Sequence, residues 1–554
     1  MSTRLQSRFR DTLLSLLLAA AACGGSEAGD GQESGDEPEG GDAREAVGVV
    51  NALASDPLVV QTASGAVRGI AVAGVDQFLG IPYAAAPVGA LRFAPPVVPA
   101  PWQGERDGSQ PGSICPQLAL TGVVGSEDCL FSNVHRPAGH AGERLPVMLW
   151  IHGGSFTSGA GSIYDPRRLV ESNGIVVVTI NYRLGPLGFL ALPELSAESG
   201  EGLSGDYGLM DQQAALRWVR DNIAAFGGDP EQVTIQGESA GGVSVCAQLA
   251  SPSAAGLFAR AVIQSASCAS GGVAVAETQG SRIATRAAAL ASDVPACTDP
   301  ARRLECLREA SLDQLLGASF AEGAVYGPVV GGQFLPSAPS DVVKVGAQHA
   351  VPVLIGGLRD EMLNFAAAPP FSYQTLATTD YPSVLSFWIP NMTPEEVLAL
   401  YPFAAYPEPY FALSAALSDN GNFYFQALGG CVTARLADDL AASTTTYAYE
   451  LDDPAFLWTP GTSYVARGAT HASDLAFLFE TTPALSAPFD AEQQALAAEM
   501  VSAFGAFIRG GDPSTPSRPW PRYDTLDRRM LHLEPNAVAV TSDFRVRHNC
   551  DVWR

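Results

Sequence analysis

Residues 232–249 read QVTIQGESAGGVSVCAQL. The stretch begins as a β-forming run, passes through the G-x-S-x-G pattern of Gly237 to Gly241, and continues with a helical pattern over residues 242–249. A glycine-flanked serine between a strand and a helix is typical of a nucleophile elbow, a sharp turn that exposes the serine side chain. Glycines are needed because a Cβ on either side would collide with the neighbouring strand or helix. The free N–H groups of the helix N-terminus then point at the reacting carbon. Ser239 is therefore the candidate nucleophile.

The segments around this stretch predict an α/β protein. Apolar runs predict strands at residues 146–152, 175–182, 232–236, 260–264, 351–355 and 445–450. Most of these runs lack strict alternation, which indicates strands buried on both faces of a mostly parallel sheet. An amphipathic helix at residues 211–225 separates two of them, so we expect a large central sheet with helices on both faces. Residues 63–68 predict a small antiparallel hairpin near the N-terminus.

Composition limits the function classes. The chain has 554 residues, of which 47% are hydrophobic and 16% charged, a net charge of −26 and a single lysine, Lys344. Such a surface repels phosphate, which argues against a nucleic-acid partner. Residues 57–554 contain no second linker and no internal repeat, so they are predicted to form one domain.

The N-terminus resembles an export signal. Arginines precede an apolar run at residues 13–22 that is too short for a permanent membrane helix, and residues 1–22 fit a signal peptide. The run ends in Ala-Ala-Cys-Gly, so Cys23 resembles the lipidated first residue of a bacterial lipoprotein, although Ala20 stands where leucine is usual. Residues 23–56 are rich in Gly, Ser and acidic residues and predict a disordered linker. We expect an exported protein, either an outer-membrane lipoprotein or a secreted one, with no other membrane contact.

The cysteines predict disulfides rather than a metal site. Apart from Cys23 there are eight cysteines, an even number, and disulfides are the usual state of cysteines in an exported protein. No cysteine or histidine cluster has the spacing of a zinc site, so no metal is expected.

A serine nucleophile needs a histidine base. After a strand–elbow–helix serine, the acid comes next along the chain and the histidine comes last. Four histidines follow Ser239: His349, His471, His532 and His548. The first leaves little room for an acid before it, the third sits in a strand-like MLHL run, and the last lies close to the C-terminal Cys550. His471 lies in the small-residue loop GATHASD and is the candidate base. The acid should end a strand, which leaves Asp360, Glu361, Asp452 and Asp453 open.

An oxyanion-binding loop is predicted at Trp150-Ile151-His152-Gly153-Gly154-Ser155-Phe156. This stretch follows an early predicted strand and resembles the HGGG-type loop of esterases. Its backbone N–H groups, together with that of Ala240, would bind the oxyanion of a tetrahedral intermediate.

Several further motifs occur together: FLGIPYA at residues 78–84, LRF at 91–93, SEDCL at 126–130, NYRLG at 181–185 and GLMDQ at 208–212. With the serine motif they resemble the type-B carboxylesterase/cholinesterase family over residues 58–554. The resemblance implies an α/β-hydrolase fold and a serine ester hydrolase that works through an acyl-enzyme without cofactor or metal. It implies Glu361 as the acid, His471 as the base, and Gly153 or Gly154 with Ser155 and Ala240 as oxyanion donors.

The resemblance also implies the disulfides Cys115–Cys129, Cys297–Cys306 and Cys431–Cys550, and leaves open whether Cys246 and Cys268 pair. Only thirteen residues separate Cys115 from Cys129, none of them aromatic, and residues 117–120 occupy the region of the choline-binding tryptophan of cholinesterases. We therefore expect short to medium, fairly apolar esters and not choline esters. The alternatives are a non-catalytic cholinesterase-like binding protein, or the same triad acting on amides, carbamates or lactones.

Overall fold

The computed structural model describes residues 56–140, 142–200, 202–367, 373–421, 428–458, 466–480 and 488–553. The predicted signal peptide, Cys23 and the predicted linker, except for its last residue, lie outside these ranges.

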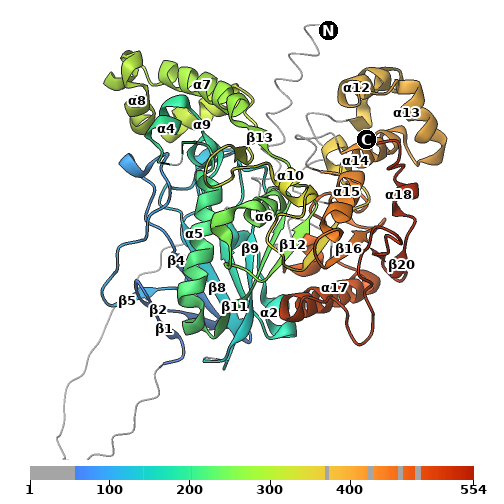
Figure 1. Cartoon of the computed structure of the whole chain (residues 1–554), viewed down its shortest axis with the longest axis horizontal. Coiled ribbons are helices and arrows are strands. Elements are labelled where there is room, and N and C mark those ends of the chain that lie inside the picture. Colours follow the sequence, from blue (N-terminus) through green and yellow to red (C-terminus); the bar gives the residue numbers. More distant parts are fainter. Residues whose placement is uncertain are drawn as a thin grey trace, which may run out of the picture.

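A mixed sheet of eleven strands forms the centre of the described chain (Figure 1). Its order is β20-β19-β16-β15-β12-β11-β9-β10-β8-β4-β3, and the seven strands from β19 to β10 run parallel. The strands at the two edges are antiparallel. The bounds are β3 (Ile70–Val72), β4 (Val75–Pro82), β8 (Phe131–Pro137), β9 (Leu145–Ile151), β10 (Val176–Ile180), β11 (Gly228–Glu238), β12 (Arg260–Gln264), β15 (Val353–Leu358), β16 (Thr446–Leu451), β19 (Met530–Leu533) and β20 (Ala539–Thr541).

The predicted mostly parallel sheet is confirmed, and all six predicted strands are present, β12 with the predicted bounds and the other five with shifted ends. The hairpin is also confirmed, as β1 (Val59–Thr62) and β2 (Gly65–Arg68), and β5 (Glu105–Asp107) adds a third strand to it. The predicted helix corresponds to α5 (Tyr207–Asn222), which begins earlier than expected and ends in the 3₁₀ turn η3 (Ile223–Phe226).

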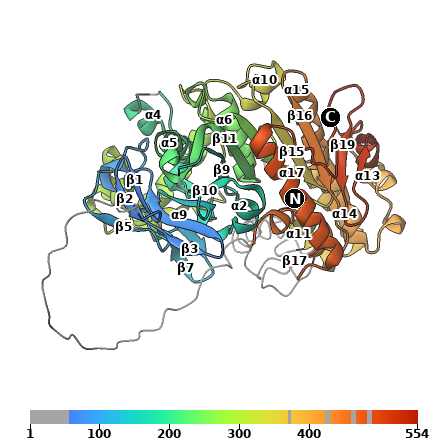
Figure 2. The same ribbon diagram turned by 90° about the horizontal axis from the view of Figure 1, so that it is seen from below.

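Helices cover both faces of the sheet, as predicted (Figure 2). Strand β9 shows why: Leu149 and Ile151 pack into one buried cluster, while Met148 and Trp150 pack into another on the opposite face. Helices α5 and α6 (Ala240–Ala250) cover the first face. Helices α2 (Arg167–Asn173) and α17 (Ala491–Gly510) cover the second. Because alternate side chains of a strand point to opposite faces, an unbroken apolar run fits a strand buried on both.

Two groups of helices lie beside the end of the sheet where α6 begins (Figure 1). One consists of α7 (Val273–Leu290), α8 (Arg303–Glu309) and α9 (Leu312–Ala321), and the other of α12 (Tyr381–Trp388), α13 (Pro394–Leu400) and α14 (Pro409–Asn420). The remaining helices are α3 (Gly185–Phe189), α4 (Pro193–Glu198), α10 (Pro339–Lys344), α11 (Leu363–Ala367), α15 (Gly430–Ala441), α16 (Leu475–Leu478) and α18 (Phe544–Arg547). Short strand pairs are β6 (Gln117–Ala119) with β7 (Gly122–Val124), β13 (Gly271–Gly272) with β14 (Val329–Val330), and β17 (Leu457–Trp458) with β18 (Ala466–Arg467).

Four disulfides join the eight cysteines of the described chain. They are Cys115–Cys129, Cys246–Cys268, Cys297–Cys306 and Cys431–Cys550. The second of these is the pair that the sequence left open. Across the described ranges, no helix combines the length and the apolar character needed to cross a membrane.

Candidate active site

Ser239 occupies a sharp turn between the last residue of β11 and the first residue of α6. Its backbone has φ 58° and ψ −125°, a conformation that non-glycine residues rarely adopt. The two motif glycines allow the turn: a Cβ at Gly241 would lie 2.1 Å from the Ile151 carbonyl oxygen, and one at Gly237 would lie 2.4 Å from the Gly241 backbone. The local structure is therefore the strand–turn–helix expected of a nucleophile elbow.

His471 contacts one of the four carboxylates that the sequence left open. Its Nδ1 lies 2.8 Å from Glu361 Oε2, and the other Glu361 oxygen accepts the Leu358 N–H at 3.0 Å. Both side chains are buried. The three rivals have other partners. Asp360 and Asp452 each pair with Arg359 at 2.7 Å, and Asp453 accepts a hydrogen bond from Gln493.

A second carboxyl group, that of Glu238, faces the other side of the imidazole. Glu238 Oε1 lies 3.2 Å from His471 Nε2, and the side chain is buried. Burial raises the pKa of Glu238 to about 8. Burial by itself lowers the pKa of His471, but the nearby carboxylates of Glu238 and Glu361 have a larger effect and raise this pKa to about 9. Within the described ranges Ser239 Oγ makes no hydrogen bond to His471, whose Nε2 faces Glu238 instead.

Glu238 was missed by the sequence analysis. The available signal was an acidic residue directly before the candidate serine. Its contact with a residue more than two hundred positions away could not be inferred from that signal.

Asp474, three residues after His471, links the His471 loop to the central sheet through hydrogen bonds. It is buried, and its Oδ2 accepts hydrogen bonds from Gln264 Nε2 at 2.7 Å and from the Tyr449 hydroxyl at 3.3 Å. Burial raises the pKa of Asp474 to about 6. The backbone carbonyl of Gln264 in turn accepts the Ser239 N–H at 3.0 Å. The loop that carries His471 and the turn that carries Ser239 are thereby joined through one glutamine.

The predicted oxyanion loop packs directly against Ser239. A Cβ at Gly153 would lie 3.0 Å from the Ser239 Cβ. Gly154 has φ 102° and Ser155 has φ 54°, so the loop turns sharply at these residues. Ala240 is the first residue of α6, where backbone N–H groups have no partner within the helix. The N–H groups of this loop and of Ala240 thus belong to the immediate surroundings of the serine.

Two buried side chains hold the oxyanion loop and the residues directly after it. The Nδ1–H of His152 donates to the Gly153 carbonyl at 2.8 Å, and its ring stacks on Tyr182. Burial lowers the pKa of His152 to about 4, so the ring is neutral. Gln117, from the short Cys115–Cys129 loop, accepts the Gly159 N–H at 2.9 Å and donates to the Gly159 carbonyl at 3.0 Å.

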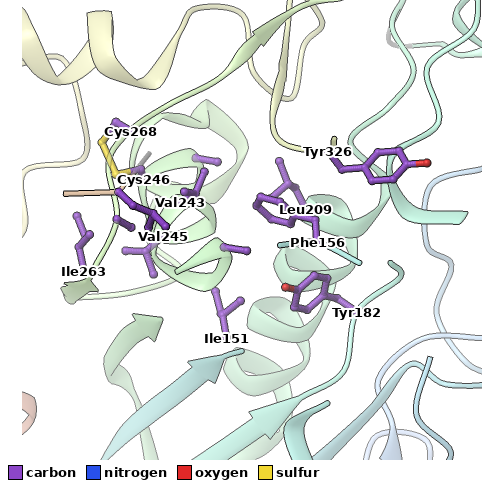
Figure 3. Close-up of a cluster of buried hydrophobic side chains, with 14 of the residues drawn as sticks. Ile151, Phe156, Tyr182, Leu209, Val243, Val245, Cys246, Ile263, Cys268 and Tyr326 are labelled. Atoms are coloured by element: carbon purple, nitrogen blue, oxygen red, sulfur yellow. A yellow bond between two sulfur atoms is a disulfide. The ribbon is translucent and has the colours of Figure 1, made fainter. Parts of the chain in front are cut away.

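An apolar pocket opens beside Ser239. Ser155, Ser239 and Ala240 form part of its lining, and no charged side chain of the described chain contributes to it. The pocket has a volume of about 120 Å³. In Figure 3, Val243 projects from α6, and Phe156 and Tyr326 lie on one side of this helix. The larger apolar residues that line the pocket are Phe156, Phe189, Val243, Val275, Val325, Tyr326, Val329 and Leu428.

Of the pocket residues, the sequence analysis singled out only those of the serine and oxyanion motifs. Apart from Val243 in the helical pattern after the serine, the other lining residues lie outside the motifs found in the sequence. No three histidine, cysteine or acidic side chains in the described part of the chain are placed to hold a metal ion together.

Comparisons with known proteins identify the family of the chain. The model of the carboxylesterase family matches residues 56–553. The para-nitrobenzyl esterase of Bacillus subtilis (strain 168) is 35% identical over 507 residues, which cover 88% of this chain and 96% of that protein. The fumonisin B1 esterase of Sphingopyxis macrogoltabida is 33% identical, with 86% of each chain covered.

Solved structures of the same kind share the fold. A carboxylesterase of Geobacillus stearothermophilus superposes with a TM-score of 0.75 at 33% identity, covering 90% of this chain and all of that one. The chain therefore belongs to the carboxylesterase family and is a carboxylic ester hydrolase with the α/β-hydrolase fold.

Proposed function

We propose that the protein hydrolyses esters through an acyl-enzyme formed on Ser239. Ser239 Oγ attacks the ester carbonyl carbon while His471 Nε2 takes its proton, and Glu361 holds the imidazole through Nδ1. The N–H groups of Gly153 or Gly154, Ser155 and Ala240 stabilise the oxyanion. His471 then protonates the leaving alcohol, and water hydrolyses the acyl-enzyme. The observation that carries this proposal is the 2.8 Å contact of His471 with Glu361 beside the strained serine turn.

The His471–Ser239 hydrogen bond has to form when substrate binds. In the free protein His471 Nε2 lies 3.2 Å from Oε1 of Glu238, the residue directly before the serine, so it has to exchange this contact for one with Oγ. Catalytic hydrogen bonds of this type are often long in a free enzyme and tighten in the substrate complex.

We infer that the pocket beside Ser239 takes the acyl part of the ester. The leaving alcohol has to lie within reach of His471, which protonates it, and His471 is absent from the described pocket lining. The lining instead contains Ser239 and the oxyanion residues Ser155 and Ala240. The acyl group therefore extends from the carbonyl carbon into this pocket.

Pocket size and chemistry support short to medium, uncharged acyl groups. The volume of about 120 Å³ is slightly below the roughly 150 Å³ of an engineered apolar cavity that binds benzene. Its walls are apolar and carry no charge that would favour a charged substrate. On the short loop, Leu118 lies in a hairpin and lines a separate apolar cavity with Thr157 and Pro186. Residues 116–128 of this loop therefore contribute no aromatic face for a quaternary ammonium group, which argues against choline esters.

Replacement of Ser239 tests the proposal. Ser239→Ala should lower kcat for p-nitrophenyl acetate by roughly 10⁶-fold and abolish labelling by a fluorophosphonate probe, because the nucleophile is gone. Ser281→Ala, which changes a serine of α7 outside the pocket, is the matched control and should behave as wild type. Wild-type hydrolysis by Ser239→Ala would overturn the proposal. A panel of amides, carbamates and lactones on the same proteins would show whether another acyl bond is preferred.

We also propose that the protein is exported and anchored through a lipid on Cys23. The four disulfides of the described chain support this, since stable disulfides are typical of oxidising compartments. Cys23→Ala should move the protein from the membrane fraction to the soluble exported fraction of a bacterial host. An unchanged distribution, with an unmodified Cys23 by mass spectrometry, would contradict the anchor.

A further inference from the structure

The disulfide between Cys246 and Cys268 lies next to the pocket that holds the candidate nucleophile. Cys246 is on α6, two turns after Ser239, and Cys268 lies between β12 and β13. Both residues are buried. In Figure 3 the disulfide lies on one side of α6, Phe156 and Tyr326 lie on the other, and Val243 projects from the helix between them. The family resemblance implied the other three disulfides but not this one.

The chain directly after Cys268 forms one wall of the pocket. Ala269, Ser270 and Gly271 line the pocket, followed by Val275 and Ala276 in the first turn of α7. Cys268 is therefore the residue from which this wall extends. The bond to Cys246 fixes the beginning of the wall to the helix that carries Ser239.

The far end of the wall is attached to another pocket-lining segment rather than to the central sheet. Gly271 donates its N–H to the Pro328 carbonyl at 2.8 Å, and β13 pairs with β14. Gln279 of α7 donates to the Val325 carbonyl at 2.8 Å and accepts the Val325 N–H at 3.1 Å. Residues 269–279 and 325–329 thus form a connected unit, here called the acyl wall.

The acyl wall is also held by Asp206, directly before α5, which accepts the Val329 N–H at 2.8 Å, and by Ser196 of α4, which donates to Glu277 at 2.9 Å. Its attachment to the serine elbow runs through the residues that precede it in the chain. Ser265, three residues before Cys268, donates its N–H to Gly356 of the sheet. Ala266 packs against the first turn of α6, because a Cβ at Gly242 would lie 2.6 Å from the Ala266 Cβ. Beyond these contacts, the covalent bond from Cys268 to Cys246 connects the wall to α6.

We propose that the Cys246–Cys268 disulfide is a positioning element that sets acyl-chain selectivity. This inference rests on the proposed function, because it assumes that the pocket holds the acyl group. With the bond intact, the wall is held ready for an acyl chain that fills the pocket, and little ordering is needed on binding. Without it the wall has more freedom, so pocket-filling esters bind more weakly. An acetyl group barely enters the pocket and is indifferent to the wall.

Two double variants test this inference. C246A/C268A removes the disulfide, and C297A/C306A removes a disulfide in the α7–α8 region, outside the pocket lining, that closes a shorter loop (sequence separation 9, against 22). The measurement is kcat and KM for p-nitrophenyl acetate, butyrate and hexanoate, which share one leaving group. In C246A/C268A the KM for hexanoate should rise by about 5-fold, while kcat and KM for acetate keep about their wild-type values. In the control variant, any change in KM relative to wild type should be the same for all three esters.

A general loss of stability would give a different result. If C246A/C268A changed the KM of all three esters by one common factor, or left all three KM values unchanged, the inference would be wrong. If the variant does not fold, wild-type protein partly reduced with dithiothreitol replaces it. Alkylation and mass spectrometry then identify which disulfide has opened. The rise in hexanoate KM should follow the opening of Cys246–Cys268 and not that of Cys297–Cys306.

Fluorophosphonate labelling separates this inference from the proposed function. Failure of wild-type Ser239 to react with the probe would contradict the serine mechanism itself. Normal labelling of C246A/C268A together with an unchanged acyl-length profile would contradict only the role of the disulfide.

Discussion

At the scale of single residues, Glu238 is the most consequential neighbour of the candidate nucleophile. Chain adjacency places its carboxyl group beside Ser239, and the fold brings His471 Nε2 to 3.2 Å from it. His471 is thereby held between Glu238 and Glu361, and both carboxylates favour the protonated imidazole. A general base has to be neutral to accept a proton, so Glu238 moves activity toward alkaline pH.

Glu238→Gln should shift the acid limb of the kcat/KM–pH profile to lower pH. In the wild type this limb follows deprotonation of His471, whose pKa is raised to about 9. Loss of one carboxylate close to the imidazole lowers that pKa by about 1 unit or more. Glu231→Gln, at an exposed position on the same strand, is the control and should leave the limb in place. An unshifted limb in Glu238→Gln would show that Glu238 does not influence the base.

At the scale of elements, the junction of β11 and α6 depends on close backbone contact. The helix approaches β9 so closely that a Cβ at Gly241 would meet the Ile151 carbonyl oxygen at 2.1 Å. Backbone atoms on both sides of this contact cannot move as a flexible side chain could. The elbow geometry is thus set by the packing of α6 on the central strands.

Gly241→Ala should lower the free energy of unfolding by about 1–3 kcal/mol, because the added methyl group overpacks the junction. Labelling of Ser239 by the fluorophosphonate probe should slow as well. The matched control is Gly317→Ala in α9, where an added Cβ meets nothing within 4 Å. That substitution should raise the free energy of unfolding by about 0.5–1 kcal/mol, because alanine favours helix. Urea denaturation measures both, and equal effects would contradict the packing argument.

At the scale of the whole molecule, the C-terminal segment is attached to the sheet through buried ionisable groups. His548 lies between Asp419 of α14 and Glu450 of β16, and Arg547 also pairs with Glu450, at 2.7 Å. The Cys431–Cys550 disulfide joins the same segment to α15. Burial by itself lowers the pKa of His548, but the carboxylates of Asp419 and Glu450 have a larger effect and raise this pKa to about 10. Burial by itself raises the pKa of Glu450, but His548, His532 and Arg547 have a larger effect and lower this pKa.

These shifts predict how stability depends on pH. The stabilisation from His548 is fully present below its unfolded pKa of 6.5 and is lost as pH rises toward about 10. The stabilisation from Glu450 is present above its unfolded pKa of 4.5 and is lost as pH falls below it. The difference in Tm between wild type and His548→Gln should therefore be largest near pH 5–6 and shrink toward pH 10. Thermal scans by circular dichroism measure it, and a constant difference would contradict the role of His548.

The residue sequence by itself determined the features that depend on local pattern. The strand–GESAG–helix stretch identified Ser239, because an elbow needs glycines at fixed positions within a few residues. Unbroken apolar runs such as residues 146–152 predicted a parallel sheet buried on both faces, since burial on both sides removes alternation. Elimination among the histidines after Ser239 made His471 the candidate base, and the family motifs implied Glu361 as the acid, whereas strand ends alone left four acids open.

Only the tertiary structure decided the features that depend on distances between remote segments. Parallel strands end at one edge of the sheet, so several carboxylates gather there, and packing determines that Glu361 contacts His471. The same packing brings Glu238 to the imidazole, pairs Cys246 with Cys268, and assembles the pocket from α6, α7 and residues 325–329. Such contacts carry no local pattern because they arise only when the whole core is packed.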